Sequence, residues 1–223
     1  MEQCSFMKHA SSRELHAYWE RKRGTRCAPE RADIDPAAIR GVLSDTFIIA
    51  LNRGAGYPFR LAGTRVCALF DREIKGESFL SLWSVASRPI VSSLLTILVD
   101  ECIGTVAAAA AQSADGAPLE LELLLLPLDI PRPMFARAIG VLAPLKVPQW
   151  LGASPIGGLT LGGRRHIGAE LERRFLPRFM APRTRRGLTV YDGGQLALST
   201  EADRPHSAPL AEKSINEPLT PDR

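Results

Sequence analysis

The stretch that most constrains the fold is residues 115–146, which predicts two long neighbouring strands. An Asp-Gly pair at its start favours a tight turn, because glycine tolerates a positive φ and aspartate bonds its own backbone. Residues 119–123 then alternate leucine with glutamate, which is the period of a half-buried strand. Three more leucines lead to Pro127, which ends regular pairing because proline lacks a backbone donor. Residues 138–143 are again apolar, so we expect both segments to form the spine of an antiparallel sheet.

Three segments earlier in the chain predict further strands. Residues 46–51 are rich in β-branched and aromatic side chains, and residues 58–61 alternate after a glycine-containing turn. Residues 105–113 contain five consecutive alanines, which favour a helix by intrinsic propensity. Because this segment directly precedes the predicted hairpin turn, we interpret it as a strand.

An amphipathic helix is predicted near the N-terminus. Ser11 and Glu14 have the spacing of a capping box, in which two side chains satisfy free helix N–H groups reciprocally. Leu15, Tyr18 and Trp19 follow on one helical face. This aromatic stripe is explained either by packing on the chain's own sheet or by contact with a partner or a second copy.

A longer helix is predicted over residues 89–102, and Thr64 is a candidate cap for a shorter helix before it. The longer helix has one apolar stripe with helical spacing: Ile90, Val91, Leu94, Leu95 and Leu98. Strands, then helices, then strands give an α+β domain whose helical connection crosses one face of the sheet. The space between that face and the long helix is the natural place for a small molecule.

The length of the chain fits either one domain of ordinary size with extensions or two small domains. The chain has 223 residues, 45% of them hydrophobic, and a net charge of +4. We expect a flexible N-terminus over 1–11, a domain over 12–147 and a Pro/Gly-rich, Arg-rich, largely irregular tail over 148–223. No apolar run reaches membrane-spanning length, and the N-terminus does not have the pattern of a secretory signal. The expectation is therefore a cytoplasmic protein.

Cysteine and histidine placement gives little support for a metal or a catalytic site. The four cysteines, Cys4, Cys27, Cys67 and Cys102, are widely spaced, which favours reduced thiols. No histidine lies between residues 17 and 165, so a hydrolytic triad or a histidine metal cluster would need residues from the flanks.

Two carboxylate pairs also favour ordinary structural roles. Asp33 and Asp35 lie beside Pro36, where a solvated turn explains them better than a metal site does. Glu120 and Glu122 share one strand face, which we interpret as solvated or salt-bridged rather than as an acid–base pair. We therefore predict no metal and no enzymatic activity.

Taken in order, ten stretches of the chain resemble the PAS domain, and more narrowly the short stand-alone PAS proteins of alphaproteobacteria. These stretches are 18–20, 31–36, 59–64, 67–70, Gly76, 82–83, 119–127, 140–145, 150–152 and 190–194. The resemblance implies a five-stranded antiparallel sheet with a helical crossover, and the sequence itself adds an N-terminal amphipathic helix and a flexible C-terminal tail. It also implies a non-catalytic sensory or regulatory module that acts through protein–protein contact.

The resemblance narrows the possible cofactors without identifying one. A histidine-ligated haem is disfavoured because the core contains no histidine, and a covalent flavin because Cys67 lies in Arg-Val-Cys-Ala-Leu-Phe rather than in a flavin-type motif. A small, non-covalently bound apolar ligand remains open. The candidate pocket residues are Phe47, Phe59, Leu69, Trp83, Leu94, Leu98, Leu123 and Val141.

Two candidate contact surfaces complete the predictions. PAS domains often pair through an exposed sheet face or an N-terminal helix, so Leu15, Tyr18 and Trp19 are candidate contacts in a homodimer or with a signalling partner. Candidate anion contacts are Arg164, Arg165, Arg173, Arg174 and Arg178. The arginine-rich segment is either a solvated basic stretch or a site for a polyanion, an acidic partner or a nucleotide. The alternative function is therefore a nucleic-acid-associated regulator.

Overall fold

The computed structural model describes residues 6–129, 136–167, 183–185 and 188–190. The chain divides into two units, residues 1–177 and residues 178–223. The described part of the second unit is a short antiparallel hairpin of β7 (Arg183–Arg185) and β8 (Leu188–Val190). All other elements described below belong to the first unit.

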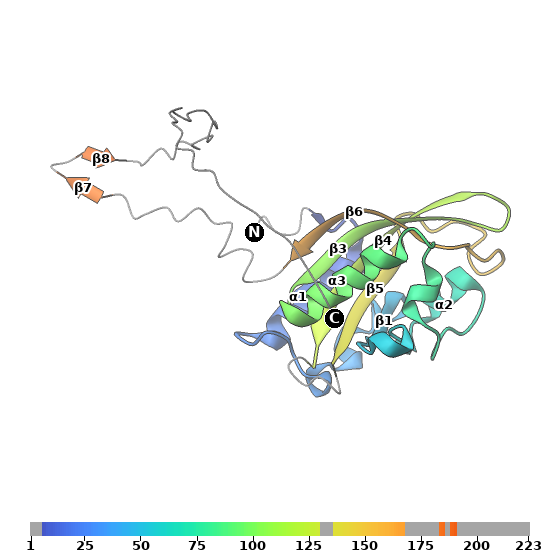
Figure 1. The fold of residues 1–223 in the computed structure, drawn as a ribbon, viewed down its shortest axis with the longest axis horizontal. Coiled ribbons are helices and arrows are strands. Elements are labelled where there is room, and N and C mark those ends of the chain that lie inside the picture. Colours follow the sequence, from blue (N-terminus) through green and yellow to red (C-terminus); the bar gives the residue numbers. More distant parts are fainter. Residues whose placement is uncertain (1–5, 130–135, 168–182, 186–187, 191–223) are drawn as a thin grey trace, which may run out of the picture. The chain divides into compact units, whose positions relative to one another are not determined.

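A six-stranded antiparallel sheet forms the centre of the first unit, in the order β2-β1-β5-β4-β3-β6 (Figure 1). Its strands are β1 (Thr46–Ala50), β2 (Phe59–Ala62), β3 (Gly104–Gln112), β4 (Pro118–Leu128), β5 (Arg137–Pro144) and β6 (Thr160–Ile167). The expected α+β class and the first five strands are confirmed. The alanine run is a strand because it pairs with β4 along its whole length, for example Ala109 with Leu121.

The sheet has six strands, not the expected five. The sixth, β6, comes from residues that the sequence assigned to the irregular tail, and it pairs with β3. Its Gly-Gly-Arg-Arg centre has no apolar alternation, so periodicity gave no signal for it. A Cβ at Gly162 would lie 3.2 Å from the Cβ of Ala108, which shows that small residues let the two strands approach closely.

Three α-helices are described: α1 (Ala10–Arg23), α2 (Thr64–Phe70) and α3 (Arg88–Asp100). The predicted caps of the first two are wrong. His9 caps α1 by accepting a hydrogen bond from the Ser11 N–H, and Gly63 occupies the N-cap of α2 without a side-chain bond. The Ser11 hydroxyl instead donates to the buried carboxylate of Asp45, a partner that is distant in sequence.

Helices cover both faces of the sheet: α2 and α3 lie on one face and α1 on the other (Figure 1). We call these the inner and outer faces. Side chains alternate between them along each strand, as the pleat requires. On β4, Leu123 belongs to the inner cluster and Leu124 to the outer one. The sheet is therefore the middle layer between two apolar cores.

Five short 3₁₀ helices connect or precede these elements within the described residues. They are η2 (Arg31–Asp33), η3 (Pro36–Ile39), η4 (Leu43–Asp45), η5 (Arg53–Ala55) and η6 (Phe79–Leu82). Asp35 caps η3 through the Ala37 N–H, and Pro36 occupies its first turn, where the fixed φ of proline suits a helix start. The segment from η2 to η4 runs across the outer face before β1 begins.

Candidate functional site

The eight candidate pocket residues are all buried, with at most 2% of any of them exposed. Six of them belong to the inner cluster: Phe47, Phe59, Leu69, Trp83, Leu98 and Leu123. Leu94 lines a separate cavity beside β6, and Val141 lies on the outer face because it alternates with the inward-facing Leu142. The eight therefore do not converge on one space. Their role as ligand contacts stays a prediction.

Aromatic rings fill the middle of the inner core. Phe79 lies 5.5 Å from Phe47, 5.6 Å from Phe59 and 5.9 Å from Trp83, measured between ring centroids. These are contact distances for stacked and edge-to-face pairs. The indole N–H of Trp83 is buried without a hydrogen-bond partner among the described residues. The four rings thus pack against one another in the middle of the inner core.

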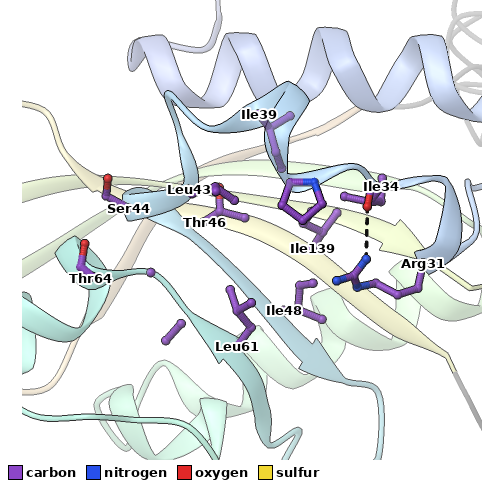
Figure 2. Close-up of a pocket in the computed structure, with 13 residues that line it drawn as sticks. Arg31, Ile34, Ile39, Leu43, Ser44, Thr46, Ile48, Leu61, Thr64 and Ile139 are labelled. Atoms are coloured by element: carbon purple, nitrogen blue, oxygen red, sulfur yellow. Dashed lines mark hydrogen bonds between the residues drawn. The ribbon is translucent and has the colours of Figure 1, made fainter.

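A cavity of about 350 Å³ lies on the outer face, between the sheet and the η2–η4 segment (Figure 2). Its floor is formed by Ile48 of β1, Leu61 of β2 and Ile139 of β5, and its roof includes Ile34 and Ile39. Four of these side chains are at least 94% buried, whereas Leu61 is 39% exposed at the rim. No local sequence pattern indicates this cavity, because its two walls are brought together only by the path of the connecting segment.

Arginines line a second hollow beside this cavity. A neighbouring hollow of about 520 Å³ shares Arg31, Ile48 and Leu61 with it and adds Arg60 and Arg137. Arg31 donates from Nη1 to the carbonyl oxygen of Ile34, at 3.2 Å (Figure 2). The two hollows form a groove that is apolar at one end and cationic at the other.

The predicted contact stripe of α1 is packed on the chain's own sheet. Leu15, Tyr18 and Trp19 are 0%, 4% and 3% exposed, within the outer cluster. The indole N–H of Trp19 donates to the carbonyl oxygen of Pro127 at 2.7 Å, and the Tyr18 hydroxyl accepts from the Asp35 N–H at 2.8 Å. These side chains are already covered by the chain's own outer cluster, so their role as contacts with a second copy or a partner stays a prediction. A homodimer through another surface stays a prediction.

Glu122 is buried, which corrects the interpretation of a solvated glutamate pair. It is 4% exposed and accepts hydrogen bonds from the backbone N–H groups of Lys8 (2.6 Å) and His9 (3.1 Å). Glu120, two residues earlier on β4, is exposed. The Glu122 carboxylate thus fixes the start of α1 to the middle of the sheet.

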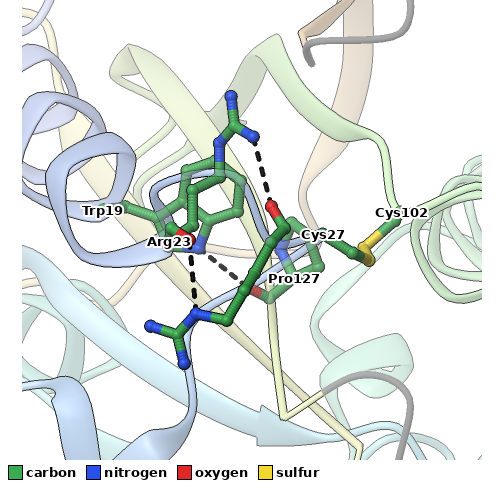
Figure 3. The surroundings of a disulfide bond; sticks show 6 residues. Trp19, Arg23, Cys27, Cys102 and Pro127 are labelled. Carbon is green, nitrogen blue, oxygen red and sulfur yellow. Dashed lines mark hydrogen bonds between the residues drawn. A yellow bond between two sulfur atoms is a disulfide. The ribbon is translucent and has the colours of Figure 1, made fainter.

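A disulfide joins Cys27 to Cys102, with their Cα atoms 5.9 Å apart (Figure 3). This corrects the expectation that these thiols are reduced. It ties the segment after α1 to the loop between α3 and β3, close to the Trp19–Pro127 contact. Cys67 is free and half-buried, and burial raises the pKa of its thiol, so it is not an activated nucleophile.

Of the five candidate anion contacts, only Arg164 and Arg165 lie within the described residues. Both are exposed on β6, and the Arg165 guanidinium lies 3.4 Å from the ring centroid of Phe6. Arg173, Arg174 and Arg178 lie outside the described residues. The predicted basic site is therefore untested as a whole.

Among the residues that the structure describes, no group of three or more histidine, cysteine or acidic side chains could hold a metal ion. Asp33 and Asp35 have structural roles. Asp33 pairs with Arg26 at 2.8 Å, and its pKa is lowered first by a hydrogen bond from the Glu30 backbone and then by Arg26. Asp35 caps η3.

A protein-family model described as "PAS domain" matches residues 7–143, from the start of α1 to the end of β5. No curated protein matches the chain. Within the described residues, none of the helices is long and apolar enough to span a membrane.

Proposed function

Because the chain belongs to the PAS domain family, we propose that it is a non-catalytic sensory and regulatory module that acts through contact with a signalling protein. The family match carries the proposal, since it covers both helical layers and five strands of the sheet. PAS membership implies a sensory or regulatory role, and no catalytic family is indicated. The closer resemblance to short stand-alone alphaproteobacterial proteins stays a prediction.

A small apolar ligand is part of the proposal, as a modulator of the contact. Exposed apolar side chains support a contact function, because they offer a partner surface outside both cores. Among the described residues outside the groove, the large ones are Phe6, Val85, Ile90 and Val147.

Site-specific photo-crosslinking in the native host tests the proposal. A photoreactive residue would replace Val85 or Val147, which are 78% and 59% exposed. We expect one position to crosslink a defined signalling protein, whose activity then changes when both purified proteins are mixed. The proposal would be contradicted if no exposed position crosslinks a signalling protein. It would also be contradicted if the purified chain itself catalyses a reaction.

The alternative of a nucleic-acid-associated regulator rests on Arg164 and Arg165, which are adjacent and exposed on β6. Binding to DNA that weakens steeply with added salt would favour it, because phosphate contacts release counterions. The cytoplasmic location also stays a prediction, and the Cys27–Cys102 disulfide is more typical of an oxidising compartment.

A further inference from the structure

We propose that the groove on the outer face binds an amphipathic anion, specifically a free fatty acid. Its acyl chain would lie between the sheet and the η2–η4 segment, and its carboxylate would face Arg31, Arg60 and Arg137. This inference rests on the proposed regulatory function and adds a site for its modulating ligand. The site lies on the opposite side of the sheet from the aromatic inner core.

The apolar end has two walls, which distinguishes it from an unpartnered flat face. Ile48 and Ile139 form the floor, while Ile34 and Ile39 come from the segment above it (Figure 2). A volume of about 350 Å³ falls within the range of small-molecule sites, about 300–1,000 Å³. The floor and the roof would both contact an inserted acyl chain, so burying the chain would remove its apolar surface from water.

The cationic end gives the ligand its charge. Arg31, Arg60 and Arg137 come from three different elements, η2, β2 and β5, and all line the second hollow. Among the described residues, the only carboxylate paired with any of them is Asp129, at 3.8 Å from Arg137. The three arginines and Asp129 together carry a net charge of +2, which favours a carboxylate over a neutral or cationic head group.

The shape of the groove favours a single acyl chain over a helix or a second copy of the protein. The η2–η4 segment lies over part of the floor, and the exposed Leu61 and Arg60 lie where solvent reaches the two hollows. A protein helix, about 10 Å across with its side chains, needs an open groove rather than a covered one. A thin, flexible acyl chain fits the apolar cavity under the η2–η4 segment, and its charged end fits the arginine-lined hollow.

Binding of dodecanoate to the full chain tests the proposal, with isothermal titration calorimetry below the concentration of micelle formation. We expect saturable binding of one molecule per chain, and much weaker binding of dodecanol and dodecyltrimethylammonium. Arg60 is exposed, so Arg60→Glu should keep the fold and weaken dodecanoate binding about tenfold. Leu61→Ser should weaken it too, by removing apolar contact at the rim.

The matched control is Lys146→Glu, which makes the same change in charge at an exposed position beyond the other end of β5. It should leave dodecanoate binding unchanged. Equal binding of dodecanol and dodecanoate, or no effect of Arg60→Glu, would overturn the assignment. So would binding to vesicles of phosphatidylglycerol without binding to free dodecanoate.

The crosslinking experiment for the proposed function uses no added fatty acid. A chain that crosslinks its partner but does not bind dodecanoate would therefore refute the ligand and retain the function. A chain that binds dodecanoate but crosslinks no partner would refute the proposed function and retain the ligand.

Discussion

Gly63 shows how one residue position shapes the groove. A Cβ there would meet the carbonyl oxygens of Leu43 and Ser44, which are backbone atoms that cannot rotate away. The Gly63 N–H also donates to the Thr46 carbonyl oxygen at 2.8 Å. The glycine therefore lets the η2–η4 segment lie directly against the end of β2, which closes one end of the apolar cavity.

Gly63→Ala should destabilise the protein by about 1–3 kcal/mol, the usual cost of overpacking. The reason is the contact with Leu43 and Ser44, since the backbone angles of Gly63 are accessible to any residue. Urea unfolding would measure the loss. The control is Gly163→Ala on β6, where an added Cβ meets nothing within 4 Å. Equal stability of the two variants would contradict the described geometry.

Glu122→Gln should cost about 1–2 kcal/mol, because each carboxylate oxygen accepts from a different backbone N–H and the glutamine amide offers only one acceptor oxygen. Glu120→Gln, at an exposed position on the same strand, should change the free energy of unfolding by less than about 0.5 kcal/mol. The two variants differ only in position, so a similar loss in both would show that the N-terminal contact contributes little.

The sequence placed both glutamates on a strand. It could not separate them, because the partners of Glu122 lie 113 and 114 residues away.

At the scale of elements, the sequence predicts the type of most helices and strands, because their signals are local. The alternation of β4 and the helical stripe of α3 both come from neighbouring residues. The stripe of α3 is confirmed except that Ile90 is 39% exposed, since it lies at the helix start. The groove and the packing of α1 depend on tertiary contacts between elements that are distant in sequence. Local periodicity does not indicate which elements make these contacts.

Removal of residues 1–23 should unfold the chain or leave it with a disordered core, rather than convert a dimer into a monomer. The deletion removes Leu15, Tyr18 and Trp19 and exposes outer-face side chains such as Leu124 and Ile139. Near-ultraviolet circular dichroism and binding of a hydrophobic dye would report the loss. A truncated chain with an intact native spectrum would show that α1 is dispensable, and would restore it as a candidate contact with another copy.

At the scale of the whole molecule, the disulfide connects the layers on either side of the sheet. Cys27 follows α1 of the outer layer, and Cys102 follows α3 of the inner layer, 75 residues later. The sequence could not predict this bond from spacing, because cysteines far apart in sequence pair only when the fold brings them together.

The double variant Cys27→Ser/Cys102→Ser should lower the free energy of unfolding by about 2–4 kcal/mol, since the unfolded chain regains the freedom of a long loop. Reduction of the native protein by dithiothreitol should have a similar effect on chemical denaturation. Cys67→Ser is the control, because Cys67 has no disulfide partner. If the thiols of the native protein react fully with a thiol reagent without prior reduction, the bond is absent.

The pairing of β6 with β3 also has a consequence for solubility. β3 is rich in alanine. Without β6, the backbone N–H and C=O groups of β3 that now pair with β6 would form an open edge of the sheet. Open edges recruit strands from other molecules, whereas the glycines and arginines of β6 make a poor template. A chain that stops at residue 147 retains the whole family match but loses this protection. It should therefore form aggregates detectable by light scattering, while a chain that stops at residue 177 stays dispersed.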